Sequence, residues 1–227
     1  MELTTSYKSI FPNEVLARYQ FAETRNAAAI IKTTNPQAFE DLTSVLGEFK
    51  LLTKDFLTPG GQETELAARL NTSFRTRGWR EARVDTLMRL SLVMTPLKSE
   101  GEKKLEPLIT ETENRGYKVD NFRDRVALDV EWNAKDGNLD RDIGAYRALY
   151  DNALIDAGVM ITRTLHDLRT LANKVGLEAG FDPERAKKIL QGTTTTNSEK
   201  LIPKLTRGDA GGCPVFTVFI SADTYVP

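Results

Sequence analysis

The chain has 227 residues, enough for one domain with a hydrophobic core, and its apolar residues form no run near the roughly 18 residues that a membrane helix needs. Its 31 basic and 32 acidic residues nearly cancel, which argues against a protein that coats nucleic acid non-specifically. The first residues lack the basic start and apolar core of a signal peptide, so we expect a cytoplasmic protein that spans no membrane.

Helical periodicity dominates the first third of the chain. Apolar residues recur at helical spacing, Asn35 can cap the second helix, and Pro36 suits its first position. We expect one domain, with an N-terminal helical part at about 13–77 and a core at about 78–220. The expected helices cover residues 13–32, 36–51 and 63–76, with a break at 58–62.

The middle of the chain combines strand and connector patterns. Alternating residues over 79–94 favour a strand or hairpin, which Pro96 ends. The charged stretch 98–113 has a narrow apolar stripe and is typical of an exposed helix or a partly ordered connector. Residues 117–133 favour two short strands, with a chain reversal at 121–125.

Helix and strand patterns alternate after residue 133. The stretch 191–212 is polar, and it precedes a final apolar strand. Strands alternating with helices predict an α/β fold with a mixed central sheet flanked by helices. The expected helices cover 139–153, 165–175 and 182–190, and the expected strands cover 156–163 and 214–220.

Acidic residues lie within the strand pattern of 126–132. Alternate residues of a strand share a face, so Asp129 and Glu131 project side by side, and the reversal before them can bring Asp120 to the same place. Crowded carboxylates repel one another unless a cation lies between them. Their hard oxygen atoms suit Mg²⁺, which can activate water for attack on a phosphate. Acids at strand ends also fit a solvated surface without function.

Other chemistry has little support in the residues. His166 is the only histidine, and it lies in a helix-like stretch where a surface position is expected. Cys213 cannot form an intrachain disulfide, and its apolar surroundings predict a packed side chain. The chain has neither a Walker sequence nor a Gly-x-Gly-x-x-Gly turn after a strand. Carboxylates are therefore the main candidates for catalysis.

The acidic segment also resembles a known family. The run 119–131 is similar to the active-site segment of type II restriction endonucleases of the BglII and BstYI group, relatives of BamHI among the PD-(D/E)xK nucleases. Segments 77–83, 156–161 and 207–220 resemble parts of that group in the same order. The resemblance covers roughly residues 77–220 and implies a PD-(D/E)xK nuclease-like core.

The resemblance implies a role for each acidic position. Asp120 matches the first metal-binding Asp, Asp129 matches the second acid, and Val130 matches a residue whose backbone carbonyl is a metal ligand. Most of these nucleases have Lys at the position of Glu131. A Glu there is similar to the BamHI variant, whereas BglII and BstYI have Gln. A Glu supplies no positive charge, but it can bind a second metal ion or accept a proton from the attacking water. Lys135 is a candidate for the missing positive charge.

The expected function is a Mg²⁺-dependent, sequence-specific endonuclease of double-stranded DNA. The resemblance implies catalytic roles for Asp120, Asp129 and Glu131, a homodimer and a palindromic target. Base-reading side chains are expected in two loops, because Arg can read guanine and Asn can read adenine. These candidates are Asn133, Lys135 and Asn138 in the first loop, and Asn197, Lys204 and Arg207 in the second.

Two alternatives remain open from the sequence. A DNA-repair or structure-specific nuclease with the same core would cut without a fixed target. A non-catalytic DNA-binding or scaffolding protein would carry the same acids as solvated surface groups.

Overall fold

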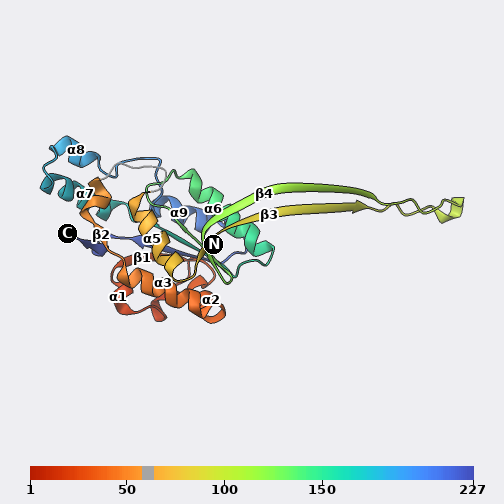
Figure 1. The fold of residues 1–227 in the computed structure, drawn as a ribbon, viewed down its shortest axis with the longest axis horizontal. Coiled ribbons are helices and arrows are strands. Elements are labelled where there is room, and N and C mark those ends of the chain that lie inside the picture. The colour runs from red at the N-terminus through yellow and green to blue at the C-terminus, as the bar shows by residue number, and fades with distance from the viewer. Residues whose placement is uncertain (58–63) are drawn as a thin grey trace. The chain divides into compact units, whose positions relative to one another are not determined.

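A computed structural model describes residues 1–57 and 64–227 (Figure 1). Its contacts divide the chain into two compact units, one of Met1–Ala82 with Val119–Pro227 and the other of Arg83–Lys118. The break expected at 58–62 and the helix start expected at Glu63 lie outside the described residues.

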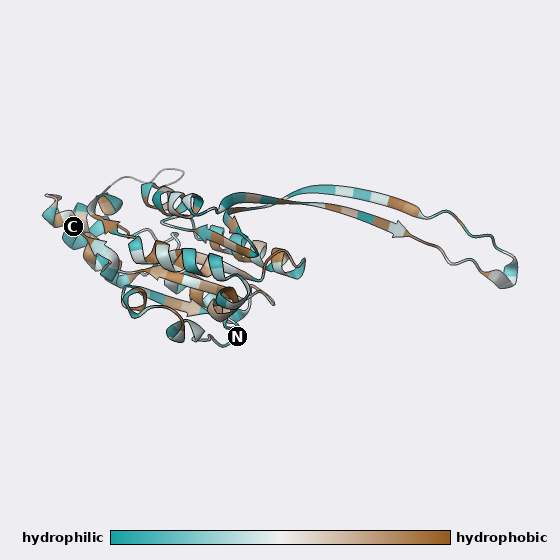
Figure 2. Cartoon of the chain, turned by 60° about the horizontal axis from the view of Figure 1, so that its bottom comes forward, coloured by the Kyte–Doolittle hydropathy of each residue, from teal (hydrophilic) through white to brown (hydrophobic). Residues whose placement is uncertain are grey.

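The central element is a mixed sheet of six strands in the order β1-β7-β6-β5-β4-β3. Every residue of its three parallel neighbours β5, β6 and β7 is buried, as expected for strands covered on both faces, and their apolar character is visible in Figure 2. The α/β fold with a mixed sheet, expected from the sequence, is confirmed. The strands are β1 (Tyr19–Glu23), β3 (Arg80–Leu92), β4 (Leu108–Arg123), β5 (Val126–Val130), β6 (Ala157–Arg163) and β7 (Val215–Ile220).

Helices pack on both faces of the parallel strands (Figure 1). On one face, Val126 and Leu128 of β5 join a hydrophobic core with α2 (Ala27–Thr34), α3 (Pro36–Glu48), α5 (Glu65–Thr76) and α7 (His166–Glu178). On the other face lies α6 (Gly137–Asp151), whose Tyr146 packs on Gly158 of β6. Next to α6 runs α9 (Ser198–Arg207), joined to it by an ion pair between Lys204 and Asp140.

The remaining short elements lie around this sheet. A two-stranded parallel sheet joins β2 to β8, and Cys213 is buried as the sequence predicted. Within the part of the chain that the structure describes, no helix is long and apolar enough to cross a bilayer. These elements are η1 (Ser6–Ser9), α1 (Asn13–Leu16), β2 (Leu51–Leu52), α4 (Thr53–Leu57), α8 (Pro183–Lys188), η3 (Ala222–Thr224) and β8 (Tyr225–Val226).

The helix expected over 13–32 is wrong, because the chain forms α1, β1 and α2 there. Strand β1 pairs antiparallel with β7, so the sheet edge supplies hydrogen-bond partners that outweigh the helical periodicity. The following residues Arg25 and Asn26 both have positive φ values, 55° and 56°, which separate the strand from α2.

Two further expectations need correction. The stretch 98–113 is neither an exposed helix nor a connector throughout: only Lys98–Glu100 forms a 3-10 turn, and β4 begins at Leu108. The polar stretch 191–212 contains α9, whose first turn is capped by the Asn197 side chain, which accepts a hydrogen bond from the Lys200 amide. Leu201 and Leu205 lie four residues apart and are buried, so α9 is amphipathic, but Pro203 inside it argues against a helix when only the sequence is considered.

Two glycines test the packing of α6 on the sheet. A Cβ added at Gly158 would lie 2.4 Å from the Tyr146 ring, whereas one added at Gly144, within α6, would meet nothing within 4 Å. We expect Gly158→Ala to destabilise the protein by about 1–3 kcal/mol. We expect Gly144→Ala to be neutral or stabilising by up to about 1 kcal/mol, because alanine favours helix. Denaturant unfolding measures both, and equal effects would contradict this packing.

Candidate active site

The turn between β4 and β5 brings two of the expected acids together. The strands pair antiparallel, with Asn121 opposite Leu128, and the chain reverses at Asp124, which has a φ of 51°. An Asp tolerates this left-handed conformation, in keeping with a structural role for Asp124. The Asp120 amide donates a 2.9 Å hydrogen bond to Asp129 Oδ1. The reversal expected from the sequence therefore places Asp120 beside Asp129.

Asp129 is a buried carboxylate, with 3% of its surface exposed. Its Oδ2 lies 2.7 Å from the Tyr146 hydroxyl, and that hydroxyl also lies 2.6 Å from the carbonyl oxygen of Val159. One hydroxyl proton cannot serve both acceptors at once, so a proton on Asp129 would complete the set. In the absence of a cation, the surroundings of Asp129 thus favour its protonated form.

Glu131 and Asp142 form the second part of the acidic site. Glu131 is 5% exposed, its Oε2 accepts a 3.2 Å hydrogen bond from Asn138, and its Oε1 lies 3.5 Å from an Arg141 nitrogen. Asp142 is 1% exposed and accepts a 2.8 Å hydrogen bond from Arg141 at Oδ1. Its Oδ2 has no hydrogen-bond partner among the described residues.

Burial and mutual repulsion dominate the electrostatics of these acids. Burial, followed by the negative charge of Asp142, raises the pKa of Asp129 to about 7. The same two causes raise the pKa of Glu131 to about 8, against the lowering effects of Asn138 and Arg141. The single positive charge of Arg141 does not balance the negative charges of the carboxylates around it. The site therefore favours binding of a proton or a further cation.

The donor set fits a hard divalent cation, although its side chains are not yet gathered around one. Across residues 1–57 and 64–227, no three acidic, histidine or cysteine side chains form a group that could hold a metal ion. The pKa values of Asp129 and Glu131, raised by burial and by the charge of Asp142, nevertheless favour binding of a further cation. Carboxylate and carbonyl oxygens are the ligands that such a cation prefers.

A pocket of about 390 Å³ opens onto this site. Asp120 and Glu131 line it, and so does Val130, the third residue of the expected metal site. Side chains from α5 form another part of its lining. Asp120 and Glu131 thus share one cavity that a substrate can enter, whereas the buried Asp129 lies behind its wall and is not among the lining residues. The lining also includes Asn71, Arg75, Glu81, Asn133, Asn138 and Arg141.

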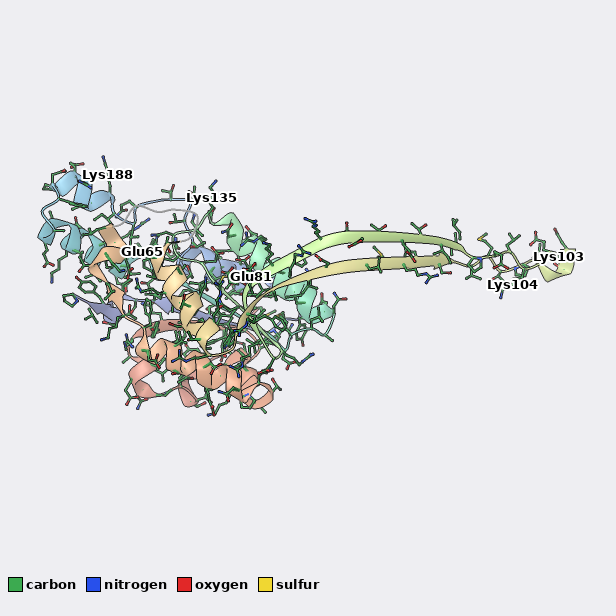
Figure 3. All side chains as sticks on the ribbon, viewed as in Figure 1. Glu65, Glu81, Lys103, Lys104, Lys135 and Lys188 are labelled. Carbon is green, nitrogen blue, oxygen red and sulfur yellow. The ribbon has the colours of Figure 1, made fainter. Side chains whose placement is uncertain are left out.

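The first group of expected base-reading residues lies at or near this pocket. Asn133 and Asn138 line it, although Asn133 Oδ1 accepts a 3.0 Å hydrogen bond from Arg163 and Asn138 holds Glu131. Lys135 is exposed in the loop before α6 (Figure 3). Asn133 and Lys135 therefore lie on the segment between β5 and α6, and Asn138 lies in the first turn of α6 beside Glu131.

The second group is engaged elsewhere. Asn197 is 2% exposed and its side chain caps α9. Lys204 pairs with Asp140, and Arg207 pairs with Asp209. None of the three lines the acidic pocket. The structure brings the two segments side by side, with a β-bridge between Lys135 and Thr195, but it leaves the side chains of the second group outside the acidic pocket.

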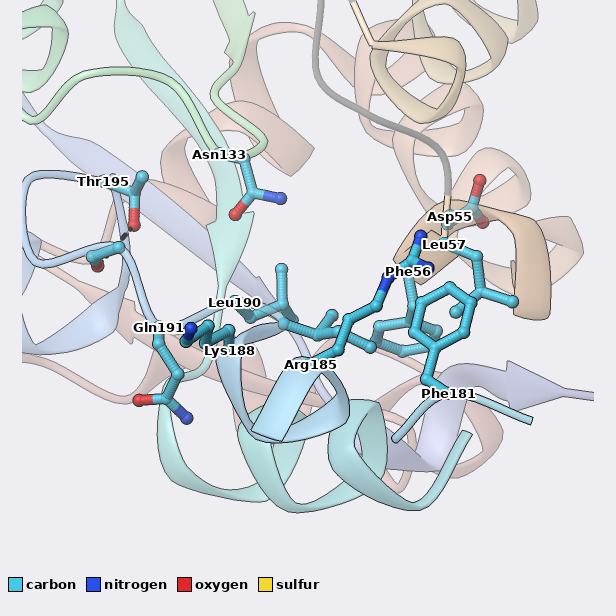
Figure 4. A pocket seen from close by; sticks show the side chains of 12 residues that line it. Asp55, Phe56, Leu57, Asn133, Phe181, Arg185, Lys188, Leu190, Gln191 and Thr195 are labelled. Atoms are coloured by element: carbon cyan, nitrogen blue, oxygen red, sulfur yellow. Dashed lines mark hydrogen bonds between the residues drawn. The ribbon is translucent and has the colours of Figure 1, made fainter. Parts of the chain in front are cut away.

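Asn133 also lines a second pocket of about 380 Å³ (Figure 4). Two basic residues of α8, Arg185 and Lys188, contribute to its wall, and the Arg185 guanidinium lies 3.8 Å from the centre of the Phe181 ring. The sequence analysis did not select these residues. Their only sequence signal is the basic end of the helix expected over 182–190.

Asp142 and Tyr146 were also missed, although a signal for them exists. They lie four residues apart on α6, so both project from the same side of the helix. Tyr146 belongs to the apolar face that predicted the helix, and Asp142 is the only acid on that face that the structure buries. A buried acid on an otherwise apolar face calls for a partner.

Comparison with known protein families gives one match. The family described as restriction endonuclease BglII/BglIII matches residues 19–220. A search of curated proteins finds no match. The matched range runs from the first residue of β1 to the last residue of β7, so it spans all six strands of the sheet and all the acids of the site.

Asp142 should make the stability of the metal-free protein fall as pH rises. An acid whose pKa is raised by folding holds its proton more tightly in the folded chain than in the unfolded chain. The free energy of unfolding therefore falls as pH rises from the unfolded pKa of about 4 to the folded pKa values of Asp129 and Glu131, about 7 and about 8. Asp142→Asn removes one source of the shift. We expect this variant to lose about 1–3 kcal/mol less than the unmodified protein between pH 5 and pH 9.

Denaturant unfolding in a metal chelator at both pH values measures this difference. Asp151→Asn, on the exposed end of the same helix, is the matched control and should follow the unmodified protein. Equal losses in all three proteins would show that Asp142 does not act on the buried acids.

Proposed function

We propose, for a chain that belongs to the BglII restriction endonuclease family, that it cuts a palindromic site as a Mg²⁺-dependent homodimer. The family makes the chain a type II site-specific deoxyribonuclease acting on double-stranded DNA. The observation that supports the proposal most strongly is the pairing of Asp120 with Asp129 across β4 and β5, within the matched range.

Restriction endonucleases generally use a divalent metal ion, and we assign Mg²⁺ to this site. Asp120, Asp129 and the carbonyl of Val130 would hold it. Mg²⁺ prefers hard oxygen ligands and keeps several of its water molecules, and it also binds the phosphate oxygens of a substrate. When bound, the ion lowers the pKa of a water molecule and offsets charge on the leaving oxygen.

The other side chains act on protons and charge. Glu131 accepts a proton at its carboxylate from the attacking water, a role that suits an acid whose pKa is raised towards neutral pH. Asn138 and Arg141 hold Glu131 in place. Arg141 also lines the pocket, so it replaces the positive charge that a Lys at position 131 would give. It is better placed for this than Lys135, which does not line the pocket.

DNA would lie across the two pockets that share Asn133. The pair Arg185 and Lys188 suits contacts with backbone phosphates, because Arg and Lys neutralise phosphate charge. Asn133, Lys135 and Asn138 remain the proposed readers of base edges. Each copy would cut one strand of a two-fold symmetric target, which explains the homodimer. We also propose that the chain is related to BstYI and BamHI and that the protein is cytoplasmic.

A plasmid digest separates this function from a repair or structure-specific nuclease. We expect discrete DNA fragments with Mg²⁺ present, because base-edge contacts restrict cutting to one target sequence. A continuous smear would indicate cutting without a fixed target. Sequencing the fragment ends gives the target and shows whether it is palindromic.

Replacing Asp129 tests the catalytic assignment. Asp129→Asn keeps the hydrogen-bonding size of the side chain but removes the charge that would hold the metal ion. We expect cleavage to fall by at least about a hundredfold, while DNA binding in the presence of Ca²⁺ stays within a few-fold. The exposed Asp151→Asn variant should cut normally. Normal cleavage by Asp129→Asn would support a non-catalytic role for the acids.

A further inference from the structure

The unit Arg83–Lys118 is a hairpin that exposes many large apolar side chains. It contains the outer parts of β3 and β4, and Figure 2 shows hydrophobic and hydrophilic residues along both strands. Most of the large apolar side chains that the described chain leaves exposed belong to it. They are Leu87, Met88, Leu90, Leu92, Val93, Met94, Leu97, Leu105, Leu108, Ile109 and Tyr117.

The two faces of the hairpin differ in charge. Arg89 on β3 pairs with Glu111 on β4 at 3.3 Å, so odd-numbered residues of both strands share one face. That face carries all the charged residues of the paired segments 84–92 and 108–116. The even-numbered residues form the opposite face, which we name the uncharged face. It consists of Val84, Thr86, Met88, Leu90, Leu92, Leu108, Thr110, Thr112, Asn114 and Gly116.

Such a face needs a cover. Two strands alone are marginally stable in water, and in the described part of the chain the hairpin has no second layer over Met88, Leu90, Leu92 and Leu108 of the uncharged face. The opposite face exposes Leu87 and Ile109 as well, but among charged side chains. Leu90 is 58% exposed and Leu92 is 57% exposed, so the apolar surface is not buried within the hairpin itself. Contiguous apolar patches of this kind mark interaction surfaces.

The charges of the hairpin argue against DNA as the cover. The unit has seven basic residues against six acidic ones, a net charge of +1. Binding to a phosphate backbone requires Lys and Arg that are not balanced by acids. The uncharged face offers none, and the pair Lys103 and Lys104 lies near the hairpin tip, away from the paired strands (Figure 3).

We propose that the uncharged face packs on the same face of a second copy of this chain. The inference rests on the homodimer of the proposed function, because a palindromic target brings two identical copies together. An uncharged surface can pack on itself about a two-fold axis without opposing like charges. Two hairpins stacked in this way form a four-stranded sandwich, in which Leu and Met side chains interdigitate.

Two substitutions on neighbouring residues of β3 test this contact. Leu90→Glu places a charge on the uncharged face, and Ser91→Glu places the same charge on the opposite face. Both residues are exposed, so neither variant should disturb folding, which circular dichroism checks. Sedimentation velocity over a range of concentrations gives the dimer dissociation constant. We expect Leu90→Glu to weaken the dimer by at least about tenfold and Ser91→Glu by less than a few-fold.

The outcomes separate this inference from the proposed function. If Leu90→Glu dimerises like the unmodified protein, another partner covers the uncharged face and the inference is wrong, while the homodimer stands. If the unmodified protein is a monomer at all concentrations, and also when bound to the DNA that it cleaves, both this inference and the proposed homodimer are wrong. Hydrogen exchange gives a second reading: the amides of 84–92 should exchange more slowly in the dimer than in the Leu90→Glu monomer.

Discussion

The carboxylate of Asp129, buried at the end of β5, is the constraint on which the site depends. Its two oxygens link β5 to β4 through the Asp120 amide and to α6 through the Tyr146 hydroxyl. The hydrogen bonds hold the β4 to β5 reversal against α6, while the packing of Tyr146 on Gly158 fixes α6 on the sheet. Position and charge of the acid are therefore set by the fold.

Burial also gives the site its chemistry. Three carboxylates, those of Asp129, Glu131 and Asp142, are almost removed from water, with Arg141 as the nearby cation. A fold that needed only stability would gain by replacing such a cluster with apolar side chains. The lack of positive charge suits a nuclease, because a divalent cation would balance both the carboxylates and the negative phosphate of the substrate. Stability without metal and activity with metal thus depend on the same residues.

The sequence was sufficient for the parts of the structure where pattern and packing agree. The alternation that placed Asp129 on one face of β5 and the reversal that brought Asp120 beside it are local properties, and the structure has both. Strands β6 and β7 were visible as short apolar runs because they are buried on both faces.

Long-range pairing explains what the sequence could not show. Strand β1 has helical periodicity and becomes a strand only because β7 offers its edge. The outer part of β4 depends in the same way on β3. Asp142 lay on a correctly predicted helix, but its importance appears only when α6 is placed over Asp129 and Glu131. Asn197 fits a base-reading residue by its type and position in the sequence, but in the structure its side chain caps α9.

In the proposed enzyme, buried and partly protonated carboxylates receive the metal ion. Calorimetric titration with Mn²⁺ at pH 7, in two buffers of different ionisation enthalpy, counts the protons released on binding. A metal ion must displace the protons that the raised pKa values of Asp129 and Glu131 retain. We expect release of roughly one proton per ion at pH 7 and much less at pH 9. Binding without proton release at pH 7 would contradict it.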